Sequence, residues 1–107
     1  MDDALAVIHE EPRTPHSVQA LCERTSTSER TLRHAFQQRF GVSPRTYVQS
    51  LRLNGARHEL RAANPSVETV TRVAQRWGFT NSGEFAAAYA RIFGEWPSES
   101  LQRAARR

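Results

Sequence analysis

The chain contains no lysine, and its fifteen basic side chains are all arginines. It has a single cysteine, Cys22, so an internal disulfide bond is impossible and the chain suits a reducing compartment. No apolar run approaches the ~20 residues of a membrane-spanning helix, and the acidic first residues are unlike a signal peptide. We therefore expect a protein that is neither secreted nor membrane-bound and that works in the cytoplasm.

The features of the common enzyme classes are also missing. The sequence has no glycine-rich phosphate loop, no pair of carboxylates placed for acid and base catalysis, and no nucleophile with its base. The four histidines, His9, His16, His34 and His58, lack the spacing of metal ligands. We expect no catalytic residue, no metal and no cofactor.

The balance of charge favours a polyanionic partner. The formal net charge is +4 and the isoelectric point is near 10.5. A guanidinium group donates paired hydrogen bonds to phosphate or to guanine, which suits nucleic acid. A genome rich in G and C would also favour arginine over lysine throughout its proteins. Charge alone therefore does not establish that the partner is nucleic acid.

Apolar residues recur three or four positions apart along the chain, and glycines are few. At 107 residues this pattern predicts a single all-α domain of about seven helices. Capping residues mark the predicted helix starts: Asp3, Thr14 with Pro15, Ser28, Ser43 with Pro44, Ser66, and Pro97 or Ser98. Gly41, Gly78 and Gly94 mark three predicted ends. The helix from residue 44 to about residue 63 is the longest, with one apolar stripe expected from Tyr47 to Leu60.

The two halves of the chain repeat one pattern. Five residues find a similar residue 53 positions on: Leu32, Phe36, Phe40, Gly41 and Pro44 match Phe85, Tyr89, Phe93, Gly94 and Pro97. Upstream the offset is 52, which pairs Val18 with Val70 and Cys22 with Ala74. We expect two copies of one unit, with an extra residue in the second turn. The match to alanine predicts that Cys22 is a small buried residue rather than a nucleophile.

Each copy is a short helix, a turn and a second helix, which is the helix-turn-helix arrangement. Its second helix enters the major groove of DNA. We expect residues 1–43 to form a first subdomain, 44–63 a linker helix and 64–107 a second subdomain of one domain. The linker would be roughly 30 Å long, close to the ~34 Å turn of B-DNA, so both second helices can reach successive grooves.

The residues of both predicted units match a known pattern: Ser28, Leu32, Phe36, Gly41, Ser43, Pro44, Tyr47, Arg52, Leu53, Ala56, Val73, Ala74, Gly78, Phe79, Phe85, Tyr89, Phe93, Gly94 and Pro97. On them the chain resembles the DNA-binding domain of the AraC/XylS family of bacterial transcription regulators, over nearly its whole length. The resemblance implies seven helices, two recognition helices, and a role in switching transcription, usually through contact with RNA polymerase. In such regulators an effector-binding or dimerisation domain is commonly attached. None is present in this sequence, which is therefore a fragment, an excised domain or an unusually short regulator.

On the first predicted recognition helix, a rotation of 100° per residue turns Arg30, His34 and Gln37 outward and puts Arg33 on the flank. Arginine pairs with guanine, glutamine with adenine, and histidine can donate to an acceptor on a base edge. The resemblance implies base contacts at Arg30, Arg33 and His34. The alternative is an ordinary polar face exposed to solvent.

The second predicted recognition helix turns small residues outward: Gly83, Ala87 and Ala90, with Glu84 at the edge. Ala87 stands where some members of the family place a base-reading arginine. We therefore expect the first recognition helix to dominate base readout. The second would dock by shape, with Ala87 against a thymine methyl group.

DNA phosphates are expected to contact Ser28, Arg45, Thr80, Asn81 and Ser82. Arg45 lies at the start of the linker helix, and Thr80, Asn81 and Ser82 lie at the start of the second recognition helix, where unpaired amides favour an anion. Asn81 or Ser82 would serve equally well as a simple helix cap.

Three further residues have expected structural roles. We expect Arg52 to brace the linker helix through a carboxylate or a helix-end carbonyl, and Trp77 and Trp96 to pack in the core.

The predicted function is therefore sequence-specific binding of double-stranded DNA as a bacterial transcription regulator. The alternative is a helical protein-protein interaction module that contacts RNA polymerase or another regulator. The two functions are not exclusive. Salt separates them experimentally, because phosphate contacts release counterions and weaken as salt rises.

Overall fold

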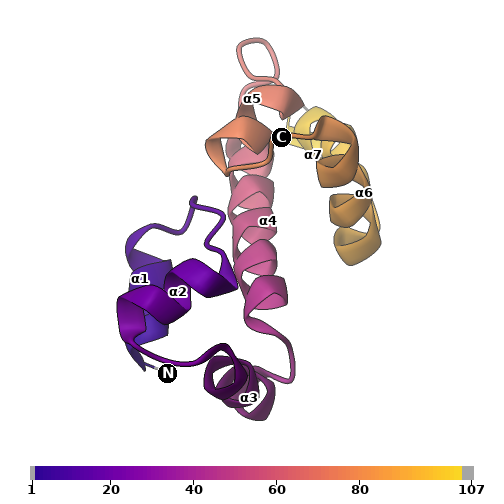
Figure 1. The fold of residues 1–107 in the computed structure, drawn as a ribbon. Helices are drawn as coiled ribbons and strands as arrows, with labels where there is room; N and C mark the ends of the chain where they lie inside the picture. Colours follow the sequence, from indigo (N-terminus) through magenta and orange to yellow (C-terminus); the bar gives the residue numbers. More distant parts are fainter. Residues whose placement is uncertain (1, 105–107) are drawn as a thin grey trace. The chain divides into compact units, whose positions relative to one another are not determined.

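The computed structural model describes residues 2–104, and over that range it consists of seven α-helices without a strand (Figure 1). The helices are α1 (Asp2–Glu10), α2 (Val18–Thr25), α3 (Glu29–Phe40), α4 (Pro44–Ala62), α5 (Val70–Arg76), α6 (Ser82–Phe93) and α7 (Pro97–Ala104). The predicted all-α class and helix number are confirmed. None of the seven is both long and apolar enough to cross a membrane.

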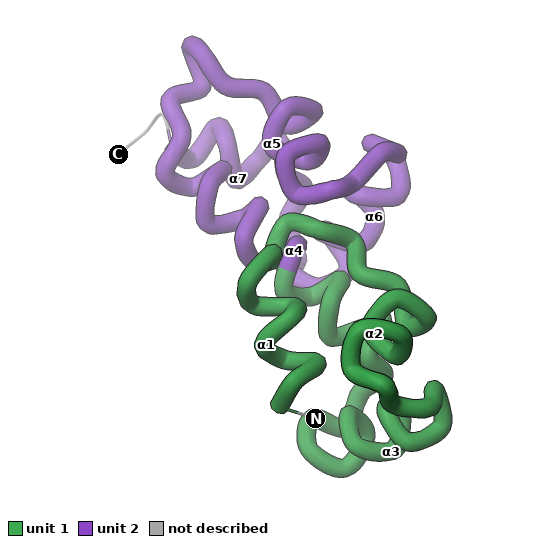
Figure 2. Tube along the Cα trace, turned by 60° about the vertical axis from the view of Figure 1, so that its left-hand side comes forward, with its two compact units in different colours: residues 1–51 green, residues 52–107 purple. Residues whose placement is uncertain are grey.

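The contacts divide the chain into two compact units, residues 1–51 and 52–107, which are green and purple in Figure 2. The first core contains Ala4, Ile8, Leu21, Leu32, Phe36 and Val48. The second contains Leu53, Ala56, Leu60, Val73, Ala74, Phe85, Ala88, Tyr89 and Leu101. The division falls within α4, whereas the expected functional division into 1–43, 44–63 and 64–107 stays a prediction.

Helix α4 has two apolar faces and not the single stripe that we expected. Val48 in its first half is buried in the core of the first unit. Leu53, Ala56 and Leu60 in its second half are buried in the core of the second unit. The expected stripe was wrong because each half of the helix is buried in a core of its own. The two cores need not contact the same side of the helix.

Ser17 and Thr69 cap α2 and α5, each accepting a hydrogen bond on its side-chain oxygen from the amide three residues on. The sequence prediction placed these starts at Thr14 and Ser66 and was wrong at both. The chain makes hydrogen-bonded turns before each helix instead. Serine and threonine share the same capping chemistry, so neighbouring candidates cannot be told apart by residue type. Asp3, the third misplaced cap, lies inside α1.

The turn of each unit contains one residue in the left-handed region, Ser26 with φ 53° and Gly78 with φ 82°. These two lie 52 positions apart, while the caps of the following helices, Ser28 and Asn81, lie 53 apart. The extra residue of the second copy therefore falls between Gly78 and Asn81. This confirms the insertion in the second turn that the repeat predicted.

Replacing Ser26 by glycine is expected to raise the free energy of unfolding by about 0.5–1 kcal/mol. The left-handed conformation costs a residue with a Cβ roughly 1–2 kcal/mol, and the greater freedom of glycine in the unfolded chain offsets part of that gain. Urea denaturation measures the change. Gly78→Ala, at the matched position, should be destabilising. A loss of stability in Ser26→Gly would mean that the serine side chain supports the turn.

Arg52 fastens α4 to the end of α5. Its Nη1 donates to the carbonyl oxygen of Trp77 at 3.2 Å, and its guanidinium carbon lies 4.2 Å from the centre of the Phe79 ring. The bracing role predicted for Arg52, through a helix-end carbonyl, is confirmed. Partial burial lowers the pKa of Arg52, which is consistent with a group that is committed to the fold.

The two tryptophans differ in their roles. Trp77 packs against the second core as expected. Trp96 is 51% exposed, so its predicted core role was wrong. It lies just before α7, where its amide donates to Glu99 Oε1 at 3.0 Å, and the next residue, Pro97, is buried instead. Cys22 is half-buried against the first core, so it is less covered than its match to alanine suggested.

Candidate nucleic-acid interface

The second helix of the first unit, α3, presents a polar outer face. Leu32 and Phe36 fix its inner side in the core. Four predicted base-reading residues, Arg30, Arg33, His34 and Gln37, are all exposed. Helix α3 is anchored at both ends, by the Ser28 cap and by Gly41 at φ 71°. Its outer side chains therefore project from a well-defined backbone.

Most of these side chains are unengaged. Within residues 2–104, no hydrogen bond or ion pair involves the side chain of Arg30, His34 or Gln37. Arg33 Nη2 lies 2.6 Å from Glu29 Oε1, and the two side chains are 60% and 57% exposed. An ion pair so open to solvent is weak. Arg33 can therefore exchange Glu29 for another acceptor at little cost.

The predicted phosphate contacts of the first unit are exposed. Ser28 and Arg45 both face solvent. Ser28 Oγ accepts from the Thr31 amide at 3.1 Å. The other amides of the first turn of α3 have no partner within the helix, and such amides are suited to an anion. A phosphate contact at Ser28 or at Arg45 remains a prediction.

The start of α6 carries the corresponding residues of the second unit. Thr80, Asn81 and Ser82 are all exposed. Asn81 Oδ1 accepts from the Glu84 amide at 2.9 Å, so the capping role that we kept as the alternative is present in the structure. A phosphate contact at these residues is compatible with that cap and stays a prediction.

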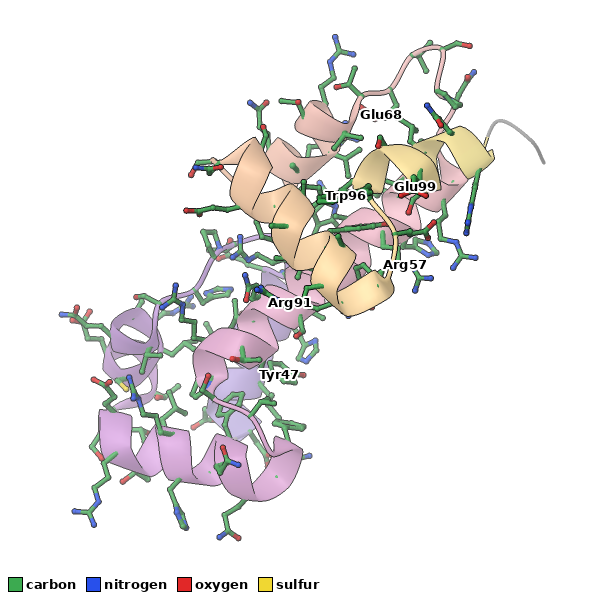
Figure 3. The ribbon with its side chains drawn as sticks, turned by 90° about the vertical axis from the view of Figure 1, so that its right-hand side faces the viewer. Tyr47, Arg57, Glu68, Arg91, Trp96 and Glu99 are labelled. Carbon is green, nitrogen blue, oxygen red and sulfur yellow. The ribbon has the colours of Figure 1, made fainter. Side chains whose placement is uncertain are left out.

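The outer face of α6 is nearly without hydrogen-bond donors. Gly83 and Ala87 are exposed as expected, but Ala90 is half-buried and does not belong to that face. Arg91 is exposed and lies about 40° around the helix from Ala87, at 100° per residue. Sequence reasoning missed Arg91, although the same rotation would have found it. It is labelled in Figure 3.

The described residues contain no cluster of metal-binding side chains. Among residues 2–104, no group of three or more histidine, cysteine, aspartate or glutamate side chains could hold a metal ion. Each unit instead presents one exposed helix on a helix-turn-helix frame. The fold and these two faces define a DNA-binding domain of the helix-turn-helix class.

Comparison with known proteins places the chain within this class. A family described as a helix-turn-helix domain matches residues 21–103. The chain is 39% identical over 88 residues to the probable thc operon regulatory protein of Rhodococcus erythropolis, covering 82% of this chain and 26% of the relative. It is 40% identical over 83 residues to the transcriptional activator RhaS of Escherichia coli, covering 78% and 29%. The chain thus spans little more than a quarter of the length of these relatives.

Solved structures of known proteins also have the fold of this chain. A probable AraC family transcriptional regulator from Rhodopseudomonas palustris superimposes with a TM-score of 0.83 at 38% identity, covering 96% of this chain and 94% of that one. The DNA-binding domain of AdpA, solved with a target DNA, shares the fold with a TM-score of 0.85 at 24% identity, covering 99% and 94%. The chain belongs to the AraC/XylS family, as a DNA-binding domain of transcription regulators and not an enzyme.

Proposed function

We propose that this chain binds double-stranded DNA at a specific sequence and so regulates transcription, with α3 supplying most of the base readout. One observation carries the proposal: Arg30, Arg33, His34 and Gln37 share an exposed face of one anchored helix. Membership of a family of transcription regulators supports DNA as the ligand.

The chemistry of this face suits the major groove. A guanidinium group can donate two hydrogen bonds to O6 and N7 of guanine, so Arg30 and Arg33 would each select a guanine. Gln37 suits adenine, and His34 can donate to a base acceptor. Each bidentate contact is worth about 1–3 kcal/mol of discrimination. The two arginines would therefore dominate the sequence preference.

The second unit would dock mainly by shape. Gly83 and Ala87 are too small to hold α6 away from the groove floor, and the Ala87 methyl group can meet a thymine methyl. Contacts to phosphate would fix the position of both units without reading sequence. We assign these contacts to five residues: Ser28, Arg45, Thr80, Asn81 and Ser82.

Helix α4 would act as the spacer between the two recognition helices. Its 19 residues make a helix roughly 28 Å long, which is of the order of one turn of B-DNA, ~34 Å. We propose that α3 and α6 lie in successive major grooves when the chain is bound to DNA.

Selection of bound duplexes from a random pool tests the proposal. A single preferred sequence should be enriched, and its association constant should fall with salt by about 0.9 logarithmic units per decade for each phosphate contact. Fluorescence anisotropy at several salt concentrations measures this slope. The absence of enrichment, or an affinity that does not depend on salt, would contradict the proposed function.

Arg91→Ala is expected to weaken binding about equally for all duplexes and to lower the salt slope by about 1. Arg91 lies toward the end of α6, so its long side chain suits a backbone phosphate better than a base. Arg72→Ala is the matched control, because Arg72 lies in the same unit and donates to the carbonyl of Val67 at 3.2 Å. An unchanged slope in Arg91→Ala would exclude this contact.

A protein partner is the second candidate function, favoured by exposed large apolar side chains in the second unit. Val67, Ile92 and Trp96 are 69%, 48% and 51% exposed, and a contiguous patch of such side chains would mark an interface. RNA polymerase is the partner that a transcription activator would contact. Loss of transcription activation with unchanged DNA affinity in Trp96→Ala would favour this function.

The setting of the domain is also part of the proposal. The relatives are three to four times as long as the matched region, which supports attachment to an effector-binding or dimerisation domain. A DNA-binding regulator of this family would work in the cytoplasm, where bacterial DNA lies.

A further inference from the structure

A hollow of about 210 Å³ lies along α4 within the second unit. Its lining consists of Asn54, Arg57, His58 and Arg61. These residues are three, four and seven positions apart, so all four lie on one face of the helix. Each can donate a hydrogen bond through nitrogen, and the lining contains no carboxylate.

Arg57 is the least satisfied of the four side chains. Its guanidinium carbon lies 4.7 Å from the centre of the Phe93 ring, which holds the planar group in place. Its Nε is covered and has no hydrogen-bond partner. Among the described residues, no ion pair involves Arg57. A covered N–H group without an acceptor is costly, which points to an acceptor from outside the chain.

Two carboxylates of the second unit are paired with other arginines. Glu59, also on α4, pairs with Arg76 at 3.2 Å. Glu95, in the turn between α6 and α7, is 11% exposed, and its Oε2 lies 3.1 Å from Arg103 Nη1 but makes no hydrogen bond. Among the described residues, no ion pair joins a carboxylate to Arg57 or Arg61, so the two arginines give the hollow a positive charge.

This hollow is distinct from the outer face of α6. Arg57 packs against Phe93. At 100° per residue, the side chains of Phe93 and Arg91 project from α6 in directions about 160° apart. In Figure 3 the labels of Arg57 and Arg91 accordingly lie on different sides of α6. A duplex in contact with Ala87 and Arg91 therefore has no direct route to the hollow.

We infer that the hollow is a binding site for a compact oxyanion, a phosphate or carboxylate group carried by a small molecule. Guanidinium groups bind both through paired, charge-assisted hydrogen bonds. The volume has room for such a group with some of its water. The site would give the domain a ligand of its own, independent of DNA.

Amide chemical shifts of the ¹⁵N-labelled chain, titrated at constant ionic strength with inorganic phosphate and separately with succinate, test this inference. We expect saturable shifts at residues 54–61 with at least one of the two ions. Arg61→Gln should weaken that binding at least about tenfold, the loss of one charge-assisted contact. Arg61 is exposed, so this variant should keep its fold. Arg72→Gln, a matched arginine of the same unit, should bind as the parent does.

Three results would overturn the inference. Shifts that do not saturate, or that are equal in Arg61→Gln, would mean an adventitious ion only. Binding of neither ion would exclude the site. Displacement of the bound ion by the selected duplex would assign the hollow to the DNA interface instead. The titration contains no DNA until that last step. Its result therefore does not depend on whether the chain binds DNA as proposed.

Discussion

The Arg30→Ala, Arg33→Ala double variant is expected to lose about 10²–10⁴-fold of its affinity for the selected duplex. Each arginine that reads a base contributes about 1–3 kcal/mol, and both side chains lie exposed on α3. Each single variant should also relax the preference at one base position while leaving the others intact. Anisotropy titrations at fixed salt, on the selected duplex and on a panel of single-base variants of it, measure both effects.

Arg39→Ala is the matched control for this double variant. Arg39 lies on the same helix but about 180° around it from Arg30 at 100° per residue, and it packs over Phe40. Its loss removes one positive charge from α3, as each single variant does, and should change affinity little and specificity not at all. Equal affinity of the parent and the double variant for the selected duplex would defeat the assignment of α3 as the main reader.

Gly55→Ala should destabilise the chain by about 1–3 kcal/mol, the usual cost of overpacking, although alanine is the better helix former by about 1 kcal/mol. A Cβ at position 55 would overlap the Trp77 ring. The indole would have to move, and Trp77 packs against the second core. Thermal and urea denaturation measure the loss.

A second variant separates crowding from other causes. Gly55→Ala combined with Trp77→Leu removes the ring that the new methyl group meets. The alanine should then cost little or become favourable relative to Trp77→Leu alone. If alanine is equally destabilising in both backgrounds, the ring is not the reason why position 55 is glycine.

The fold could be predicted largely because the two halves of the chain repeat one helix-turn-helix pattern. Gly41 and Gly94 both end a helix in the left-handed region, and the helices before them begin 53 positions apart. Any reading of one unit could be checked against the other. The repeat could not correct the misplaced caps, because Thr14 and Ser66 lie 52 positions apart and so do Ser17 and Thr69. Serine and threonine have the same capping chemistry, and only the turn between the candidates decides which one starts the helix.

The candidate site was predictable where buried side chains fixed the rotation of a helix about its own axis. Leu32 and Phe36 point inward on α3, so its outer side chains followed from helix geometry. Arg91 was missed because the outer face was extended from Ala87 to Ala90, which lies about 60° to one side of Ala87, whereas Arg91 lies about 40° to the other side at 100° per residue. Trp96 was misjudged because size and hydrophobicity favour burial, whereas its place just before α7 leaves it outside the buried face of that helix.

In the proposed complex, α3 and α6 contact one face of a duplex one helical turn apart. Hydroxyl-radical footprinting of the selected duplex tests it directly. We predict two protected segments centred about 10 base pairs apart, of which the one under α6 is lost in Ala87→Glu while the other persists. A single protected segment, or two segments half a turn out of phase, would contradict the account.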